Sequence, residues 1–348
     1  MMKKRIIFFL ESITGTYSSY LNLFQKRDFE TAVFILEKKP SLIEKIKYVK
    51  KTISELRRFK PDFIYINDEF FTKVTLLIAF CKRFFSKRSK IIVFIASQYI
   101  PEDTFLNKIK LKFLLKNIDF LICRNKKELE RIKKIDLFKN YPNLYQVYWG
   151  FPKELFYKNS FVKKSDKFIL GFVGRIIPEK GLDTILNCLT KLPDNFELLY
   201  SGKVLNDNYG EQIERLIKEN NLSKRVECLG FTDYNNLNDI YNAIDLLIVP
   251  TTSKPNGFIE LFGSVLAESM LAKTFIIGSD NGSIPEVIGK TDLIFKQSDT
   301  DDLLRVINYV YNLSEEKREQ IIEENYCRAI GNFSSQAYVE NIINLITA

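Results

Sequence analysis

The chain of 348 residues carries a net charge of +9, has 46% hydrophobic residues and contains no histidine. Its length suggests about two domains of roughly 150 residues each, and its composition excludes collagen-like, disulfide-rich and wholly disordered proteins. Without histidine, the chain has no Ser-His-Asp or Cys-His triad, no imidazole general base and no His-ligated zinc.

The first apolar run of the chain is Ile6–Leu10, which follows three cations. It is shorter than the core of a signal peptide, and no later run approaches the roughly 20 apolar residues that span a bilayer. The cysteines are odd in number and far apart in the sequence, at Cys81, Cys123, Cys188, Cys228 and Cys327. Such cysteines are typical of reduced thiols in the cytosol. We therefore expect a cytoplasmic protein whose first apolar run is a buried strand.

Short apolar runs alternate with segments of helical periodicity, such as Ile43–Phe59, through the first 150 residues. The apolar runs predict six strands, at Arg5–Leu10, Ala32–Leu36, Phe63–Ile66, Ile91–Ile95, Phe120–Cys123 and Tyr145–Tyr148. Continuous apolar strands separated by amphipathic helices are typical of parallel sheets that are covered on both faces.

The alternation pauses at Trp149–Asp166 and then restarts. We interpret 151–166 as a linker between a first domain, 1–150, and a second domain, 167–330. Six more strands are predicted, at Phe168–Val173, Glu197–Tyr200, Val226–Leu229, Leu246–Val249, Phe275–Ile277 and Leu293–Phe295. Ser314–Ala348 has a helical pattern with a break at Gly331–Phe333, so 331–348 is expected to form a separate last helix. The sequence thus predicts two successive doubly wound α/β domains.

Charge is divided unequally between the two halves. Residues 1–150 contain 31 Lys and Arg against 15 Asp and Glu, whereas the remaining residues contain 21 and 28. This asymmetry suggests that the first half meets a polyanion, either nucleic acid or an anionic membrane surface. Nucleic acid is the weaker interpretation because no zinc, helix-turn-helix or RNA-recognition motif accompanies the charge.

Two groups of basic residues favour the membrane surface. Lys108, Lys112 and Lys116 recur every four residues and so form one stripe on a predicted helix. A second group surrounds Phe84 and Phe85, namely Lys82, Arg83, Lys87, Arg88 and Lys90. Lysines with nearby aromatic residues suit an anionic cytoplasmic leaflet. The alternative is a basic face that is merely solvated.

In the second half, three loops that follow predicted strands carry residues suited to an anionic ligand. The first contains Gly174-Arg175 and Lys180-Gly181 before a helix, and two fixed cations there suit a departing diphosphate. A solvated turn is the alternative. The second loop, with Gly202, is a weak signal, since an ordinary turn also needs glycine. The third contains Glu260 and Glu268, whose carboxylates can accept hydrogen bonds from sugar hydroxyls.

The ordered set of Gly174-Arg175, Lys180-Gly181 and Glu260-x7-Glu268 resembles the donor site of glycosyltransferase family 4, the group 1 retaining enzymes of the GT-B fold. Shorter matches extend the resemblance along nearly the whole chain, at Lys60-Pro61-Asp62, Ile118-Asp119, Trp149-Gly150, Leu229-Gly230-Phe231, Ala243-Ile244-Asp245, Ser283-Ile284-Pro285-Glu286 and Phe333-Ser334. The resemblance implies two Rossmann-like domains that face a central cleft, with the acceptor in the first domain and a nucleotide-sugar in the second. It also implies that the last helix, 331–348, returns to the first domain.

The resemblance also implies a role for each matching residue. Arg175 and Lys180 would hold the diphosphate, Glu260 would face the transferred sugar and Glu268 would bind the ribose. The rest of the nucleotide-sugar site would comprise the base-edge loop with Phe231, the backbone N–H groups of Phe262, Gly263 and Ser264, and the glycines Gly174 and Gly202. On the acceptor side, Gly15 would lie near the phosphate.

This sequence departs from the family at two places. Ser97 and Gln98 stand where the family usually has a histidine, which puts in doubt the sugar that is transferred. Leu261 replaces a small residue or proline, which we interpret as a minor change. Asp299-Thr-Asp301 is better explained as a helix N-cap than as a metal motif.

The expected reaction is therefore retaining transfer from a UDP- or GDP-sugar to an acceptor hydroxyl, without a metal or other cofactor. A phosphate oxygen of the leaving group would accept the proton. The acceptor is expected to be a lipid-linked or cell-surface glycan precursor of polysaccharide assembly, at the inner face of the cytoplasmic membrane. The alternatives are a catalytically inactive nucleotide-sugar binding subunit and a sugar-nucleotide epimerase or phosphorylase of similar architecture.

Overall fold

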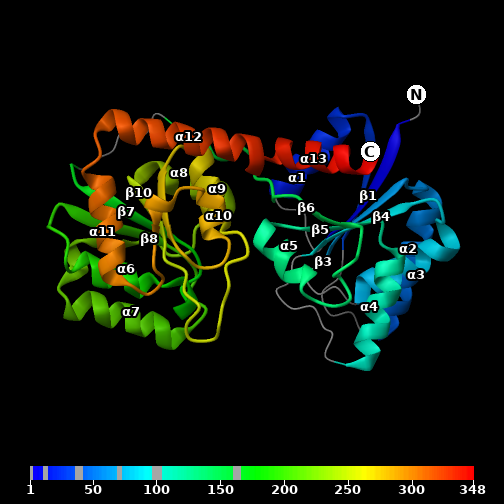
Figure 1. Ribbon diagram of the computed structural model, residues 1–348, viewed down its shortest axis with the longest axis horizontal. Helices are drawn as coiled ribbons and strands as arrows, with labels where there is room; N and C mark the ends of the chain where they lie inside the picture. The colour runs from blue at the N-terminus through cyan, green and yellow to red at the C-terminus, as the bar shows by residue number, and fades with distance from the viewer. Residues whose placement is uncertain (1–2, 11–14, 36–41, 69–72, 96–103, 160–165) are drawn as a thin grey trace. The chain divides into compact units, whose positions relative to one another are not determined.

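The computed structural model describes residues 3–10, 15–35, 42–68, 73–95, 104–159 and 166–348 (Figure 1). The chain divides into two compact units. Unit 1 comprises residues 1–150 together with 335–348, and unit 2 comprises residues 151–334. The chain therefore leaves unit 1 after Gly150 and returns to it at Ser335.

Unit 1 contains a six-stranded parallel sheet within the described residues, and helices cover both of its faces. The strand order is β2-β1-β3-β4-β5-β6, with β1 at Lys4–Leu10, β2 at Phe29–Ile35, β3 at Phe63–Asp68, β4 at Lys90–Ile95, β5 at Phe120–Cys123 and β6 at Leu144–Gln146. Side chains of β1 alternate between two cores, with Ile7 and Phe9 on one face and Ile6 and Phe8 on the other. Both faces of a strand that is covered on two sides must be apolar, which explains its continuous apolar run.

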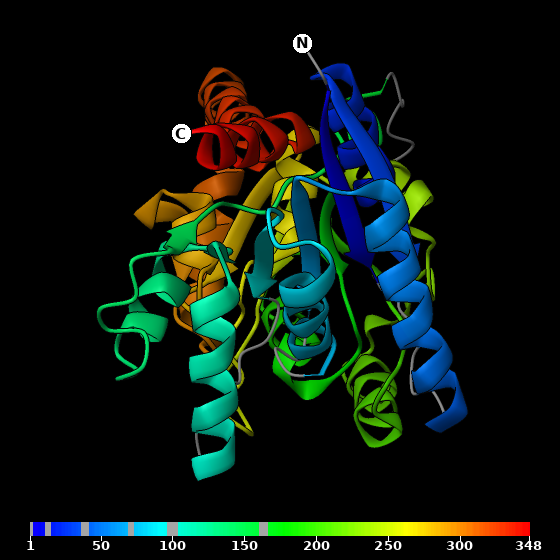
Figure 2. The ribbon, with the colours of Figure 1, turned by 90° about the vertical axis from the view of Figure 1, so that its right-hand side faces the viewer.

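The helices of unit 1 form two layers. One layer packs on the face of Ile7 and Phe9, and its three longest helices lie side by side (Figure 2). It consists of α2 at Leu42–Phe59, α3 at Lys73–Phe85, α4 at Phe105–Asn117 and α5 at Lys126–Lys133. The other layer consists of α1 at Gly15–Lys26 and α13 at Ser335–Thr347.

A buried aromatic cluster holds α13 in unit 1. The rings of Tyr338 and Tyr20 stack with their centroids 4.4 Å apart, and the hydroxyls of Tyr338 and Tyr65 are hydrogen-bonded at 2.6 Å. Tyr20 Oη also donates to the carbonyl of Gly150 at 2.6 Å. Trp149 packs into the same cluster. The last helix is therefore part of the core of unit 1 although it follows unit 2 in the sequence.

Unit 2 repeats the architecture, with a second six-stranded parallel sheet in the described chain. The strand order is β12-β11-β10-β7-β8-β9, with β7 at Phe168–Val173, β8 at Phe196–Ser201, β9 at Val226–Cys228, β10 at Leu246–Val249, β11 at Phe275–Ser279 and β12 at Ile294–Phe295. Its helices are α6 at Leu182–Leu189, α7 at Asp207–Glu219, α8 at Leu237–Ala243, α9 at Ser264–Leu271, α10 at Ile284–Ile288, α11 at Thr300–Tyr311 and α12 at Glu315–Phe333. Short 3-10 turns complete the unit, η1 at Pro178–Lys180, η2 at Leu222–Lys224, η3 at Tyr234–Asn236 and η4 at Thr291–Leu293. The predicted α/β class with two doubly wound parallel sheets is confirmed.

The segment expected to be a linker packs as part of unit 2 in its described residues, 151–159 and 166. Phe151 and Phe156 are buried. The backbone N–H groups of Tyr157 and Asn159 donate to the side chains of Asn238 and Asn242 on α8, at 2.9 and 3.0 Å. The preceding glycine and the segment's own proline and polar residues predicted a linker between the domains, and in the structure two buried phenylalanines and two asparagine side chains hold its described part against unit 2.

The break between the last two helices lies at Ser334 rather than at Gly331–Phe333. Gly331 stays helical within α12, and Ser334 is extended, with ψ of 152°. Phe333 is buried, and its carbonyl accepts a hydrogen bond from the backbone N–H of Phe151 at 2.7 Å. This hydrogen bond holds the last turn of α12, which ends at Phe333, two residues beyond Gly331.

We predict that Tyr338→Ala lowers the free energy of unfolding of unit 1 by about 3–5 kcal/mol, because it removes a fully buried ring from the aromatic cluster. Trp149, the single tryptophan of the chain, belongs to this cluster, so its fluorescence in a urea titration reports the unfolding of unit 1. Tyr309→Ala, at an exposed position on α11, is the matched control and should leave the transition unchanged. Equal urea midpoints for the two variants would contradict the structural role of the cluster.

Candidate functional site

A pocket of about 210 Å³ opens in unit 2 where β7 and β10 end and α9 begins. It is lined by Phe172, Val173, Gly174, Arg175, Lys180, Ile248, Val249, Pro250, Thr251, Glu260, Gly263, Ser264 and Val265. The carboxyl ends of parallel strands are the usual ligand position in such sheets, because loops and helix N-termini meet there. Six of the residues that the sequence assigns to a site are therefore brought together in one pocket: Gly174, Arg175, Lys180, Glu260, Gly263 and Ser264.

Lys180 is the last residue of η1, and the residue after it fixes its position. Gly181 has a φ of +70°, and a Cβ there would lie 2.2 Å from the carbonyl oxygen of Pro250. Only glycine therefore lets this turn pack against the end of β10. The ammonium of Lys180 forms an ion pair with the carboxylate of Glu260 and lies 5.3 Å from the centre of the Phe258 ring.

Glu260 is held at its backbone by the loop after β11. Its N–H donates to Oδ1 of Asn281 at 2.8 Å, and its carbonyl accepts from the N–H of Ser283 at 2.9 Å. A Cβ on Gly282 would lie 2.1 Å from that carbonyl oxygen, so this position also requires glycine. Thr251 Oγ1 donates to the Glu260 carboxylate at 3.3 Å. Sequence reasoning missed Thr251, Asn281 and Gly282, although the Asn-Gly pair after an apolar run marked a tight turn.

The start of α9 presents unsatisfied backbone N–H groups to the pocket. Gly263 precedes the helix with a φ of +73°, and no side chain in the described part of the chain caps the helix at this end. Ser264 and Val265 line the pocket. Arg175 is exposed, and its guanidinium makes no hydrogen bond or ion pair with any residue that the structure describes. The N-terminus of a helix and two cations are together suited to bind a multiply charged anion.

Glu268 lies outside the pocket lining, one helical turn beyond Ser264. It is only 3% exposed, and Tyr241 Oη donates to its carboxylate at 2.6 Å. Burial raises the pKa of Glu268 to about 7, although the hydrogen bond from Tyr241 acts in the opposite direction. The structure therefore places this carboxyl group between α8 and α9, with Tyr241 as its partner.

The other predicted residues of unit 2 lie on loops beside the pocket. Gly202 N–H donates to the carbonyl of Gly230 at 2.8 Å, and a Cβ on Gly202 would lie 1.7 Å from the carbonyl oxygen of Gly174. Gly202 is thus required by the contact between two loops. Phe231 is 68% exposed on the loop after β9. Phe262 is buried against Phe151 and Phe333, so its side chain is part of the core.

In unit 1, Gly15 is the first residue of α1. Ser97 and Gln98 lie outside the described residues. Lys108, Lys112 and Lys116 are all exposed on α4. Three large apolar residues near the beginning of α4 are exposed as well, namely Phe105, Leu106 and Ile109.

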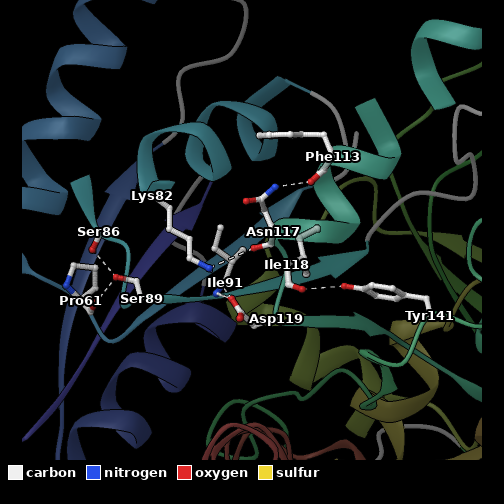
Figure 3. Close-up of polar contacts among 10 residues, drawn as sticks. All are labelled: Pro61, Lys82, Ser86, Ser89, Ile91, Phe113, Asn117, Ile118, Asp119 and Tyr141. Atoms are coloured by element: carbon white, nitrogen blue, oxygen red, sulfur yellow. Dashed lines mark hydrogen bonds and ion pairs between the residues drawn. The ribbon is translucent and has the colours of Figure 1, made fainter. Parts of the chain in front are cut away.

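A polar network at the ends of α3 and α4 removes Lys82 from the exposed basic group (Figure 3). The carboxylate of Asp119 accepts from the backbone N–H of Ile91 at 2.7 Å and from Lys82 Nζ at 2.9 Å. Lys82 Nζ also donates to the carbonyl of Asn117 at 3.4 Å, and its side chain is only 14% exposed. This lysine is therefore neutralised by an acid and holds the two helices to the sheet.

Among the residues that the structure describes, no group of three or more Cys, Asp or Glu is arranged to hold a metal ion. None of the described helices has both the length and the apolar character needed to cross a bilayer.

Comparison with known proteins gives consistent matches. The family model described as "Glycosyl transferases group 1" matches residues 153–328. An uncharacterized glycosyltransferase of Methanocaldococcus jannaschii is 28% identical over 215 residues, which cover 61% of this chain and 55% of that protein. The phosphatidylinositol N-acetylglucosaminyltransferase GPI3 subunit of Saccharomyces cerevisiae is 24% identical over 224 residues, 61% of this chain and 47% of that protein. The chain spans about half the length of these curated relatives.

Solved structures match over nearly the whole chain. A glycosyltransferase from Rickettsia africae has a TM-score of 0.81 at 14% identity, covering 99% of this chain and 97% of that chain. Anabaena HepE in complex with UDP has a TM-score of 0.79 at 18% identity, covering 99% of both chains. At these identities the likeness shows a shared fold.

The buried Glu268 predicts a pH dependence of stability. Its pKa is raised from 4.5 to about 7 in the folded protein, so the folded state binds this proton more tightly than the unfolded chain. Stability should therefore fall as the pH rises from about 4.5 to about 7 and stay constant above, by an amount on the order of 3 kcal/mol. Denaturant titrations at pH 5 and pH 8, followed by circular dichroism, measure this difference. Glu268→Gln should reduce it, and an unchanged difference would refute the assignment.

Proposed function

Because this chain belongs to the group 1 glycosyltransferases, we propose that it transfers a sugar from a nucleoside diphosphate sugar to an acceptor hydroxyl and retains the anomeric configuration. The observation that carries the proposal is the convergence of Arg175, Lys180 and the uncapped start of α9 on one pocket. These are the groups that a diphosphate leaving group requires, because negative charge grows on it as the glycosidic bond breaks.

The residues of the pocket act in two ways in this proposal. Arg175, Lys180 and the N–H groups at the start of α9 stabilise the leaving diphosphate electrostatically. Glu260 faces the sugar and accepts hydrogen bonds from its hydroxyls, which positions the reacting carbon. A phosphate oxygen of the leaving group accepts the proton of the acceptor hydroxyl on the same face of the sugar. This step requires no imidazole base, in agreement with a sequence that has no histidine.

The donor is proposed to be a UDP- or GDP-sugar. Structures of Anabaena HepE contain UDP and UDP-glucose, which supports a nucleoside diphosphate ligand for this fold. The loop with Phe231 and the contacting loops of Gly174 and Gly202 are proposed to form the base side of the site. Glu268 is proposed to bind the ribose. It would do so while sharing its carboxylate with Tyr241, which occupies one of the two oxygens.

No metal or other cofactor is included in the proposal. In many enzymes of phosphate chemistry a divalent cation neutralises the charge on the leaving diphosphate. Here Arg175 and Lys180 are proposed to supply that positive charge from the protein itself. The alternative of an inactive nucleotide-sugar binding subunit differs in one measurable respect, since it would bind the donor without turnover. A sugar-nucleotide epimerase would turn over the donor without an acceptor.

The acceptor is proposed to be a lipid-linked or cell-surface glycan precursor, reached by unit 1 at the inner face of the cytoplasmic membrane. Exposed apolar and basic residues lie on one face of α4, where Phe105 and Ile109 are followed by Lys112 and Lys116. On α3, Phe80 and Phe84 are both exposed, with ring centroids 4.9 Å apart. Cations beside exposed aromatic residues are the combination that binds an anionic lipid surface. The name of the yeast relative refers to phosphatidylinositol, a membrane lipid, which supports this choice.

We predict that Arg175→Ala lowers turnover of the nucleotide-sugar about 10²–10³-fold, the scale for losing one preorganised charge stabiliser. Release of the nucleoside diphosphate from each UDP- and GDP-sugar of a panel measures this rate. Lys218→Ala, an exposed lysine on α7, is the matched control and should keep wild-type activity. Retention of more than a third of the activity by Arg175→Ala would refute the diphosphate assignment.

We predict that purified protein co-sediments with liposomes that contain anionic lipid but not with neutral liposomes. About 0.5 M salt should release the protein, because salt screens the attraction between the lysines and the lipid. Changing Lys108, Lys112 and Lys116 together to Glu should abolish this binding. The matched control changes three exposed lysines of unit 2 to Glu, namely Lys153, Lys218 and Lys224. If both triple variants bind alike, the stripe on α4 is only a solvated surface.

A further inference from the structure

Within the pocket, the cation that is proposed to hold the diphosphate already has an anionic partner. The ammonium of Lys180 is paired with the carboxylate of Glu260, and their side chains are only 18% and 12% exposed. Arg175, in contrast, is exposed and has no such partner among the residues that the structure describes. An incoming diphosphate therefore meets one cation that is available and one that another group holds.

The loop that carries this carboxylate is fixed at its backbone. The backbone of Glu260 is hydrogen-bonded on both sides to the loop after β11, through Asn281 and Ser283. Gly282 lies against it so closely that no side chain would fit between them. The side chain can rotate, but its charge stays in the pocket. A ligand that takes Lys180 thus leaves a half-buried carboxylate beside a new anion, which is costly unless other groups donate hydrogen bonds to it.

The two ligands of the proposed reaction differ in this respect. A nucleotide-sugar brings sugar hydroxyls, which can donate to the carboxylate that has lost Lys180. The nucleoside diphosphate product lacks these hydroxyls, because the transferred sugar has left, and its remaining hydroxyls are on the ribose, which is proposed to bind at Glu268. Thr251 Oγ1 supplies one hydrogen bond to Glu260, at 3.3 Å, and does so without any ligand. Only the nucleotide-sugar therefore brings, from its transferred sugar, hydrogen bonds that replace the one that Glu260 loses when Lys180 binds the diphosphate.

We propose that Glu260 is an internal competitor for Lys180 that makes the site favour the nucleotide-sugar over the spent nucleoside diphosphate. The inference rests on the proposed function and deepens it. When the sugar leaves, the ion pair between Glu260 and Lys180 forms again and displaces the phosphates. Glu260 is thus a specificity-determining residue, in addition to its contact with the sugar.

Calorimetric titration of UDP, GDP and inorganic pyrophosphate into the wild type and Glu260→Gln tests the proposal. Gln keeps the size of the side chain but removes its charge, so the variant should bind the nucleoside diphosphate about tenfold more tightly. Glu260→Asp keeps the charge but shortens its reach, and it should show a smaller gain. Glu211→Gln, an exposed residue of α7, is the control for the loss of one negative charge. It should bind as the wild type does.

A double-mutant cycle with Lys180→Met identifies the group for which Glu260 competes. In the Lys180→Met background, Glu260→Gln should no longer increase the affinity for the nucleoside diphosphate. If the increase in affinity persists in the Lys180→Met background, the competition is refuted while the proposed function stands. The same holds if the wild type binds the nucleoside diphosphate and Glu260→Gln binds it no more tightly. If none of the proteins binds UDP, GDP or pyrophosphate, the proposed function fails and the inference with it.

Discussion

The geometry of the candidate site depends on three places where one backbone segment touches another without a side chain between them. Gly181 lies against the carbonyl of Pro250, Gly202 against that of Gly174, and Gly282 against that of Glu260. A Cβ at these positions would lie only 2.2, 1.7 and 2.1 Å from the respective carbonyl oxygen, far closer than two non-bonded atoms can approach. These contacts bring the ends of β7, β8, β10 and β11 together, and they thereby position the charged side chains of the pocket.

Some lysines of this protein are paired with acids, so they do not contribute a free positive charge. The basic excess of the first 150 residues suggested a broad cationic surface, yet Lys82 is used inside unit 1 to compensate Asp119. In unit 2, Lys180 is likewise paired with Glu260. The number of lysines is therefore larger than the number of cations that a ligand or a membrane can reach. A paired and partly buried lysine must lose its carboxylate partner before it can bind another anion.

The sequence predicted most of the fold because each strand is a continuous apolar run, and both faces of each sheet are covered. It also placed Gly174, Lys180 and Glu260 near one another, since all three follow strands of one parallel sheet, whereas Glu268, predicted for the same site, lies outside the pocket lining. Other features depend on packing between distant elements and left no local signal. The partner of Glu268 is Tyr241, on a different helix, and the polar segment after Gly150 is held by asparagines more than 80 residues away. The exact end of α12 depends on a hydrogen bond from Phe151 to Phe333.

The return of the chain to unit 1 has a consequence for its synthesis. Four residues of α13, namely Tyr338, Val339, Ile342 and Ile346, complete the core on one face of the first sheet. On the ribosome, the residues before 150 emerge long before this helix, so the part of that face that α13 covers stays open while the whole of unit 2 is made. Unit 2, residues 151–334, is contiguous and can fold as soon as it has emerged. Unit 1, which begins before unit 2, is therefore completed after it, and the apolar residues that α13 covers stay exposed to solvent in the meantime.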